Sequence, residues 1–164
     1  MGSNTSTQTL TYKSIDSQPL FRAVENNEIK QFELLLTKEN VNNYEENRIY
    51  VKEIKKELNN TSLLAYCVIY NRYEFIRMLI KNNVNINESA FNGKVAYSYM
   101  TAYDLCRHIH MQSGDRGKIL NLFNPYILSG DWIETKSPEG KTLYYDLETN
   151  RTTYDRNECI IIYE

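Results

Sequence analysis

Cysteine and glycine are scarce in this chain, and each scarcity argues against a class of protein. There are three cysteines and six glycines among 164 residues. The cysteines, at positions 67, 106 and 159, form no closely spaced pair, so a disulfide framework is not expected. We expect reduced thiols in the core of a cytoplasmic protein, with a nuclear location as the alternative. No glycine-rich loop of the kind that cradles a phosphate is present.

Long apolar runs and a strong excess of one charge are also missing. No run approaches the ~20 apolar residues that span a bilayer, and no signal-peptide core follows Met1. The chain has 19 basic and 21 acidic residues, a net charge of −2. Lysines cluster at positions 52, 55 and 56, and Glu53 and Glu57 interrupt them. Nucleic acid, which needs a clustered basic surface, is therefore not an expected partner.

What the chain does have is enough apolar residues for a globular core, in patterns that predict short helices. Hydrophobic residues make up 41% of the chain and aromatic residues 12%. Within residues 61–87 they recur at helical spacing in two short runs that Asn71 separates. Asn tolerates the left-handed conformation that ends a helix. This stretch predicts two antiparallel helices, and such a pair needs similar neighbours to bury its apolar faces.

The neighbours are present, because three segments align on a small residue followed by an apolar turn. They begin at residues 18, 62 and 101 and lead to apolar runs that end at Leu36, Ile80 and Phe123. The aligned small residue is Ala23, Cys67 or Cys106. The first two segments share an offset of nine residues from this position to the second run, whereas the third has a longer loop that contains Gly114 and Gly117.

These segments resemble the ankyrin repeat, whose pattern runs T-P-L-H-x-A-A, a helix, V-x-x-L-L and then G-A-D-V-N. The close matches are Pro19-Leu20 with Ala23, residues 83–87 and residues 101–105. The resemblance covers residues 15–123 and implies about three stacked helix pairs that bind a protein partner. It departs from the pattern at Asn27 and Asn71, which replace the loop glycine, and in lacking the TPLH histidine. The surface candidates that it implies are Arg22, Glu25, Tyr66, Ile69 and Tyr70.

Two segments outside the helix pairs are less determined. Residues 1–14 are polar and rich in Ser and Thr, so we expect disorder. Their start fits the N-myristoylation pattern at Gly2, the alternative being an ordinary polar N-terminus. A peripheral membrane location is expected only if Gly2 is modified. Residues 38–60 form either an extra helix or the arm of a long hairpin, and periodicity does not decide between them.

Strand-forming residues dominate after Pro125. Turn signals at residues 137–140 and 148–150 divide residues 128–157 into three short strands. The β-branched residues 160–162 favour a fourth strand or a packed strap within residues 158–164.

Residues 132–154 resemble a WW domain, most closely the kind found in pre-mRNA splicing factors. The match needs no gap and includes Trp132, the S-P-x-G turn, the central tyrosines and the E-T-x-x-x-T stretch. It implies a three-stranded sheet that binds proline-rich peptides, with Trp132 and Tyr144 packed on the opposite face. The groove residues that it implies are Leu143, Tyr145, Leu147, Thr152 and Tyr154. Leu143 stands where the family has an aromatic wall, Tyr154 replaces the second Trp, and Asn157 replaces a proline.

No catalytic or metal site is expected. Cys106, His108 and His110 are close in sequence, but positions two apart on a helix point in different directions. The sequence therefore predicts an α+β protein without cofactor, a monomeric and non-enzymatic adaptor that binds a protein partner, weakly proline-rich at the WW-like sheet. The alternative is a single fused interaction unit in which the groove is non-functional and the sheet only stabilises the stack.

Overall fold

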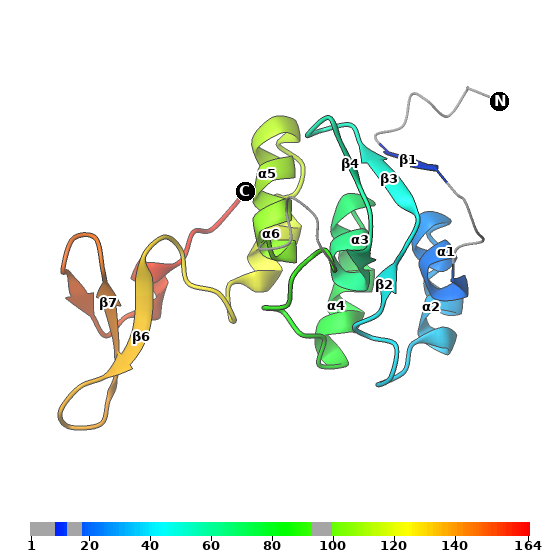
Figure 1. Ribbon diagram of the computed structural model, residues 1–164. Coiled ribbons are helices and arrows are strands. Elements are labelled where there is room, and N and C mark those ends of the chain that lie inside the picture. The colour runs from blue at the N-terminus through cyan, green and yellow to red at the C-terminus, as the bar shows by residue number, and fades with distance from the viewer. Residues whose placement is uncertain (1–8, 13–17, 93–99) are drawn as a thin grey trace. The chain divides into compact units, whose positions relative to one another are not determined.

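The chain folds into two compact units of mixed α and β structure (Figure 1). The computed structural model describes residues 9–12, 18–92 and 100–164. The first unit is Met1–Leu120 and the second is Asn121–Glu164. The α+β class is therefore as predicted from the sequence.

Helices of the described residues come in three consecutive pairs. The pairs are α1 (Pro19–Glu25) with α2 (Ile29–Leu35), α3 (Leu63–Ile69) with α4 (Tyr73–Lys81), and α5 (Ala102–Ser113) with α6 (Gly117–Phe123). They lie where the three aligned segments predict them. Local sequence fixes their starts: the Ser62 hydroxyl accepts from the Ala65 N–H, and Thr101 and Asp104 form a reciprocal capping box.

The tight loops inside the first two pairs are built alike. Asn27 (φ 56°) and Asn71 (φ 60°) adopt the left-handed conformation, as Gly114 (φ 71°) does in the third pair. In both Asn loops the next residue's N–H reaches back to the aligned small residue, Glu28 to Ala23 and Arg72 to Cys67, each at 2.9 Å. The prediction that Asn takes the place of the loop glycine is confirmed.

Residues 38–60 form strands and not an extra helix. Strand β3 (Arg48–Val51) pairs antiparallel with β4 (Lys56–Leu58), and a left-handed Lys55 helps to close the turn. Ile49 and Val51 are fully buried and alternate with more exposed residues, which is the period of a half-buried strand. The hairpin alternative is confirmed. Two shorter strands flank this hairpin in the sequence, β2 (Tyr44–Glu45) before it and β5 (Thr61–Ser62) after it, and they pair antiparallel with each other.

The N-terminal segment contains one described element. Strand β1 (Thr9–Tyr12) pairs antiparallel with β3, which differs from the disorder expected across residues 1–14. The edge of β3 that does not face β4 has N–H and C=O groups with no partner in the hairpin, and β1 pairs with this edge. Gly2 lies outside the described residues.

Helix α3 is the centre of the first unit. Every one of its residues is buried, and it lies against α1, α4 and α5. The aligned small residues Ala23, Cys67 and Cys106 are at most 1% exposed, and both thiols are free, as predicted. Burial raises the pKa of Cys67 far above its usual value and that of Cys106 to about 12. These thiols fill the core and are not nucleophiles at neutral pH.

The second unit is a three-stranded antiparallel sheet with a C-terminal extension. Its strands β6 (Trp132–Lys136), β7 (Thr142–Asp146) and β8 (Thr152–Thr153) lie in the order β6-β7-β8. Left-handed Gly140 and Asn150 lie in the two turns, where turn residues were expected. A short 3₁₀ helix, Arg156–Cys159, follows the sheet. Residues 160–163 join no described strand, and hydrogen bonds hold the main chain of Ile161 and Tyr163. The side chains of Ile161 and Ile162 are exposed, so the segment is neither a fourth strand nor a fully packed strap.

Candidate functional site

One face of the second unit's sheet exposes apolar and aromatic side chains to solvent. The pairs Ile133 with Tyr145, Tyr145 with Thr152, and Thr135 with Leu143 are directly opposite one another, so these side chains share a face. Ile133 is 42% exposed, although Ile normally lies inside. We call this surface the open face.

The five groove residues expected from the sequence fall on or beside the open face. Leu143, Tyr145 and Thr152 are on it by strand register. Leu147 and Tyr154 follow the ends of their strands and are 58% and 61% exposed. The hydroxyl of Tyr145 donates to the Asn150 side chain, which holds the ring in place at the centre of the sheet.

The opposite face is covered. Tyr144 is only 7% exposed, and Trp132 is half-buried on the same face. The guanidinium of Arg156 lies 6.0 Å from the ring centre of Tyr144, and that of Arg151 lies 5.8 Å from the Trp132 ring. Such distances are within the range of cation–π attraction. Each of the two rings on this face therefore has an arginine beside it.

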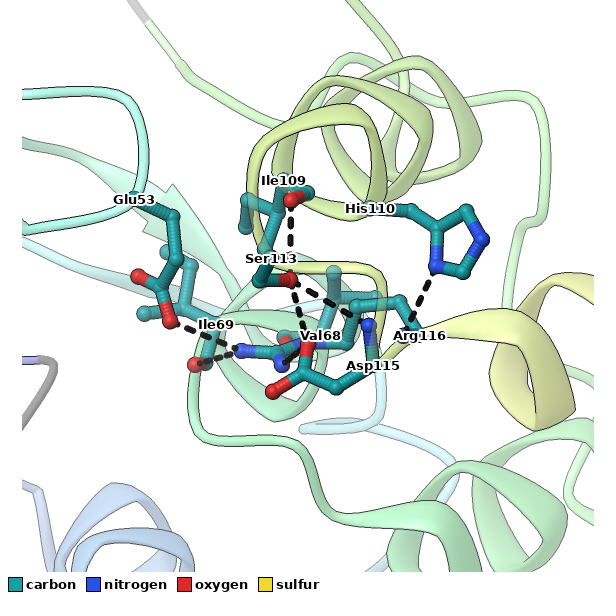
Figure 2. Close-up of polar contacts among 8 residues, drawn as sticks. All are labelled: Glu53, Val68, Ile69, Ile109, His110, Ser113, Asp115 and Arg116. Atoms are coloured by element: carbon teal, nitrogen blue, oxygen red, sulfur yellow. Dashed lines mark hydrogen bonds and ion pairs between the residues drawn. The ribbon is translucent and has the colours of Figure 1, made fainter.

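A second site, in the first unit, is a buried arginine (Figure 2). Arg116 precedes α6 and is 2% exposed. Its Nε donates to the carbonyl of Val68 and its Nη2 to that of Ile69, both at 2.9 Å. Asp115 Oδ1 lies 2.5 Å from Nη1, and Glu53 Oε2 from the β3–β4 turn lies 3.6 Å from Nη2. The arginine therefore joins the third helix pair, the end of α3 and the hairpin.

The same arrangement occurs one helix pair earlier. Arg72 precedes α4, and it donates to the carbonyls of Val24 (2.7 Å) and Glu25 (3.0 Å) at the end of α1. Arg72 and its two acceptors each lie 44 residues before Arg116 and its acceptors. Each arginine satisfies C-terminal carbonyls of the preceding pair's first helix, which lack partners within their own helix. Sequence analysis missed this contact, although two arginines at the spacing of the first two segments were a signal.

The polar groups around Arg116 hold one another and leave no activated nucleophile. The Ser113 hydroxyl lies within hydrogen-bond distance of the Ile109 carbonyl and of the Asp115 carboxylate. Partial burial raises the pKa of Asp115, but the bond from Ser113 and the charge of Arg116 outweigh it and hold that pKa below its usual value. His110 Nδ1 accepts the Arg116 N–H at 2.9 Å. The cluster ties three segments together: the third helix pair, the end of α3 and the β3–β4 turn.

The expected surface of the helix pairs is partly wrong. Arg22 is exposed, and Glu25 and Tyr70 are half-buried. Tyr66 and Ile69 are buried, at 0% and 1% exposure, so neither is a surface residue. The Tyr66 ring packs edge-on against Phe21 and its hydroxyl bonds Glu25, while the Ile69 carbonyl accepts from Arg116. Neighbours on both sides of α3 bury residues that a single helix pair would expose.

Among the residues that the structure describes, no three His, Cys, Asp or Glu side chains gather as a metal ion would need. Cys106 is buried, whereas His108 of the same helix is exposed. Within residues 9–12, 18–92 and 100–164, no helix is both long and apolar enough to cross a membrane. No family model matches the chain, and no curated protein or solved structure matches it either.

Proposed function

We propose that this chain is a non-enzymatic adaptor for protein–protein interaction. In this proposal the first unit is a short stack of ankyrin-like repeats that binds a protein partner. The second unit is a WW-like sheet that binds proline-rich peptides weakly. The observation that carries the proposal is the open face, where Ile133, Leu147 and Tyr154 are exposed and Tyr145 is half-buried. An exposed apolar patch on a small unit is characteristic of a binding surface.

A polyproline II peptide suits the open face because it is already extended and loses little entropy on binding. Leu143 and Tyr154, which the continued register of β7 and β8 sets opposite each other, are the two walls between which a proline would lie in this proposal. Tyr145 and Thr152 are the next pair along the two strands. Leu143 is rounded where a flat aromatic ring would stack, and Tyr154 offers less area than Trp. Weak binding is therefore expected.

The repeated arginine contact supports the repeat interpretation of the first unit. Ankyrin-like pairs bury their faces by stacking on neighbours of the same shape. Arg72 and Arg116 each fasten a pair to the one before it with the same two bonds. At the aligned position of the first pair the residue is Glu28, which is exposed. A polar residue there suits the first repeat of a stack.

The test is to rebuild the two walls of the groove. The double variant Leu143→Tyr with Tyr154→Trp is titrated with a Pro-Pro-Leu-Pro peptide, and amide shifts are followed by NMR. We expect at least a tenfold gain in affinity, because losing a hot-spot wall costs about 2 kcal/mol or more. Glu139→Gln, in the exposed β6–β7 turn, is the control and should leave binding unchanged. If the folded double variant shows no shifts at millimolar peptide, the proline-rich part of the proposal is wrong.

The same result would favour the alternative, a single fused interaction unit whose sheet serves only as support. The two proposals differ in a pull-down with the intact chain and with a chain that ends at Asn124. An adaptor with two surfaces loses only its proline-rich partners on truncation, whereas a fused unit loses its single partner.

A further inference from the structure

Residues 159–163, which we call the strap, are held along one edge of their main chain. The carbonyl of Cys159 accepts from both the N–H (2.8 Å) and the hydroxyl (2.9 Å) of Ser129. Four residues later, the side-chain amide of Asn121 holds Tyr163 at both its main-chain groups. Asn121 Nδ2 donates to the Tyr163 carbonyl at 2.6 Å, and Oδ1 accepts the Tyr163 N–H at 2.8 Å.

A third contact lies between these two. Asn124 Nδ2 donates to the carbonyl of Ile161 at 3.1 Å. The held residues are therefore 159, which ends the 3₁₀ helix, and then 161 and 163. Alternate residues of an extended segment place their main-chain groups on one edge, as in a β-strand. The strap behaves as a strand whose partner on that edge is a row of Ser and Asn groups from the end of α6 and the segment after it.

The other edge of the strap is open. The main-chain groups of Ile160 and Ile162 form no hydrogen bond within the part of the chain that the structure describes. Ile160 is extended (φ −127°, ψ 160°), and the Ile161 and Ile162 side chains are 44% and 69% exposed. An extended, β-branched segment with a free row of N–H and C=O groups is a template for pairing with another strand.

We propose that this open edge docks an extended segment of a partner protein by β-strand addition. The bonds from Ser129, Asn124 and Asn121 hold the main chain of the strap in place, so an incoming strand pairs without ordering it first. The second unit has eight acidic residues against four basic ones, and the exposed Glu164 follows the strap directly. The partner segment is therefore β-branched and apolar at its centre, with Lys or Arg at its ends. This surface is separate from the open face of the sheet and does not depend on proline binding.

The probe is the capped peptide acetyl-Lys-Thr-Val-Thr-Val-Lys-amide, titrated into the full chain by NMR. Binding should shift and protect the amides of Ile160 and Ile162. N-methylation of one central residue leaves the other edge of the peptide able to pair, so that peptide should still bind. N-methylation of two successive central residues blocks both edges and should abolish binding.

Variants of the chain distinguish strand pairing from non-specific hydrophobic binding to the exposed isoleucines. Ile162→Pro removes the open-edge N–H and should weaken binding roughly tenfold, the value of one or two strand hydrogen bonds. Ile162→Thr keeps the N–H and the β-branch, and should bind like the natural chain. Asn121→Leu releases Tyr163 and should also weaken binding, whereas Asn157→Leu, at an exposed asparagine with no side-chain contact to the strap, should not.

Four outcomes would overturn this proposal. The first is the absence of shifts at millimolar peptide, and the second is equal binding by Ile162→Pro and Ile162→Thr. The third is concentration-dependent self-association in analytical ultracentrifugation that the peptide does not reverse, which would assign the edge to a second copy of the chain. Shifts confined to Leu143 and Tyr145 would likewise reject the strap and place the peptide on the open face.

Discussion

The two units differ in which side chains they place against the usual pattern of burial. In the first unit a cation, Arg116, is buried and has a partner at each nitrogen of its guanidinium. In the second unit apolar and aromatic side chains, such as Leu147 and Tyr154, are exposed. A buried charge is tolerated only where its partners are complete, so Arg116 indicates architecture. An exposed apolar group gains nothing from folding, and the open face is the surface on which we propose that a partner binds. Mutations in either unit test this contrast.

The largest effect is expected from Arg116→Ala. It leaves the carbonyls of Val68 and Ile69 unsatisfied, and it leaves the buried carboxylate of Glu53, whose oxygens have no hydrogen-bond donor among the described residues, without its cation. We expect a loss of about 3–5 kcal/mol in the free energy of unfolding, measured by urea denaturation. Arg107→Ala, at an exposed arginine of α5, is the control and should cost under about 1 kcal/mol.

Comparing Arg72 with Arg116 makes the measurement of unfolding free energy more specific. Arg72 makes the equivalent two bonds but is only half-buried, so Arg72→Ala should cost less than Arg116→Ala. The double variant Arg116→Met with Glu53→Leu removes both charges and should recover part of the loss. Equal stabilities for Arg116→Ala and Arg107→Ala would mean that the buried contact does not hold the helix pairs together.

The contrast between the units also explains what the sequence could predict. Periodic apolar residues define the helix pairs, and turn residues such as Asn71 and Gly140 define their ends and the strand turns, because these are local properties. Residues 38–60 stayed ambiguous because a short apolar run fits a strand and a helix alike. The burial of Tyr66 and Ile69 depends on helices that pack from two sides. One helix pair does not reveal it, although the all-apolar α3 sequence is typical of a helix buried all round.

The open face was predicted more completely than the buried arginine, for a physical reason. Side chains on a strand alternate, so Leu143, Tyr145 and Thr152 can be assigned to one face from their spacing and the turn positions. Arg116 is buried because carbonyls 48 and 47 residues away accept its bonds. Main-chain carbonyls have no sequence signature, so only the recurrence of Arg at a spacing of 44 could have indicated the contact.

In the second unit the aromatic residue that matters most for stability is Tyr144, and the effect there should be smaller than at Arg116. Tyr144 is 7% exposed, whereas Trp132 is only half-buried. We expect Tyr144→Ala to cost about 3 kcal/mol in this unit, and Trp132→Ala to cost clearly less. The single tryptophan makes its fluorescence a reporter of this unit for Tyr144→Ala, and near-UV circular dichroism serves for Trp132→Ala.

Tyr126→Ala is the control for these two variants. Its ring is 51% exposed, so its removal should leave the unfolding of the second unit nearly unchanged. If Trp132→Ala were the more destabilising of the two aromatic variants, the stability of the covered face would depend mainly on Trp132 and not on Tyr144.

The smallest effect is expected from Asp115, the half-exposed partner of Arg116. Because its pKa is lowered in the folded chain, the unfolded chain binds its proton more readily. Its contribution to stability is therefore complete above the pKa of an unfolded Asp, about 3.9, and is lost as the pH falls through the lower folded value.

Asp115→Asn imitates the protonated side chain. It should lower stability at pH 7 by less than about 1 kcal/mol, because solvent screens a half-exposed pair. The difference from the natural chain should shrink below pH ~4 and vanish in strong acid. Asp131→Asn, at an exposed aspartate of the second unit, controls for the loss of one negative charge. A difference that stays constant from pH 7 to strong acid would show that Asp115 stabilises the loop by its shape and not by its charge.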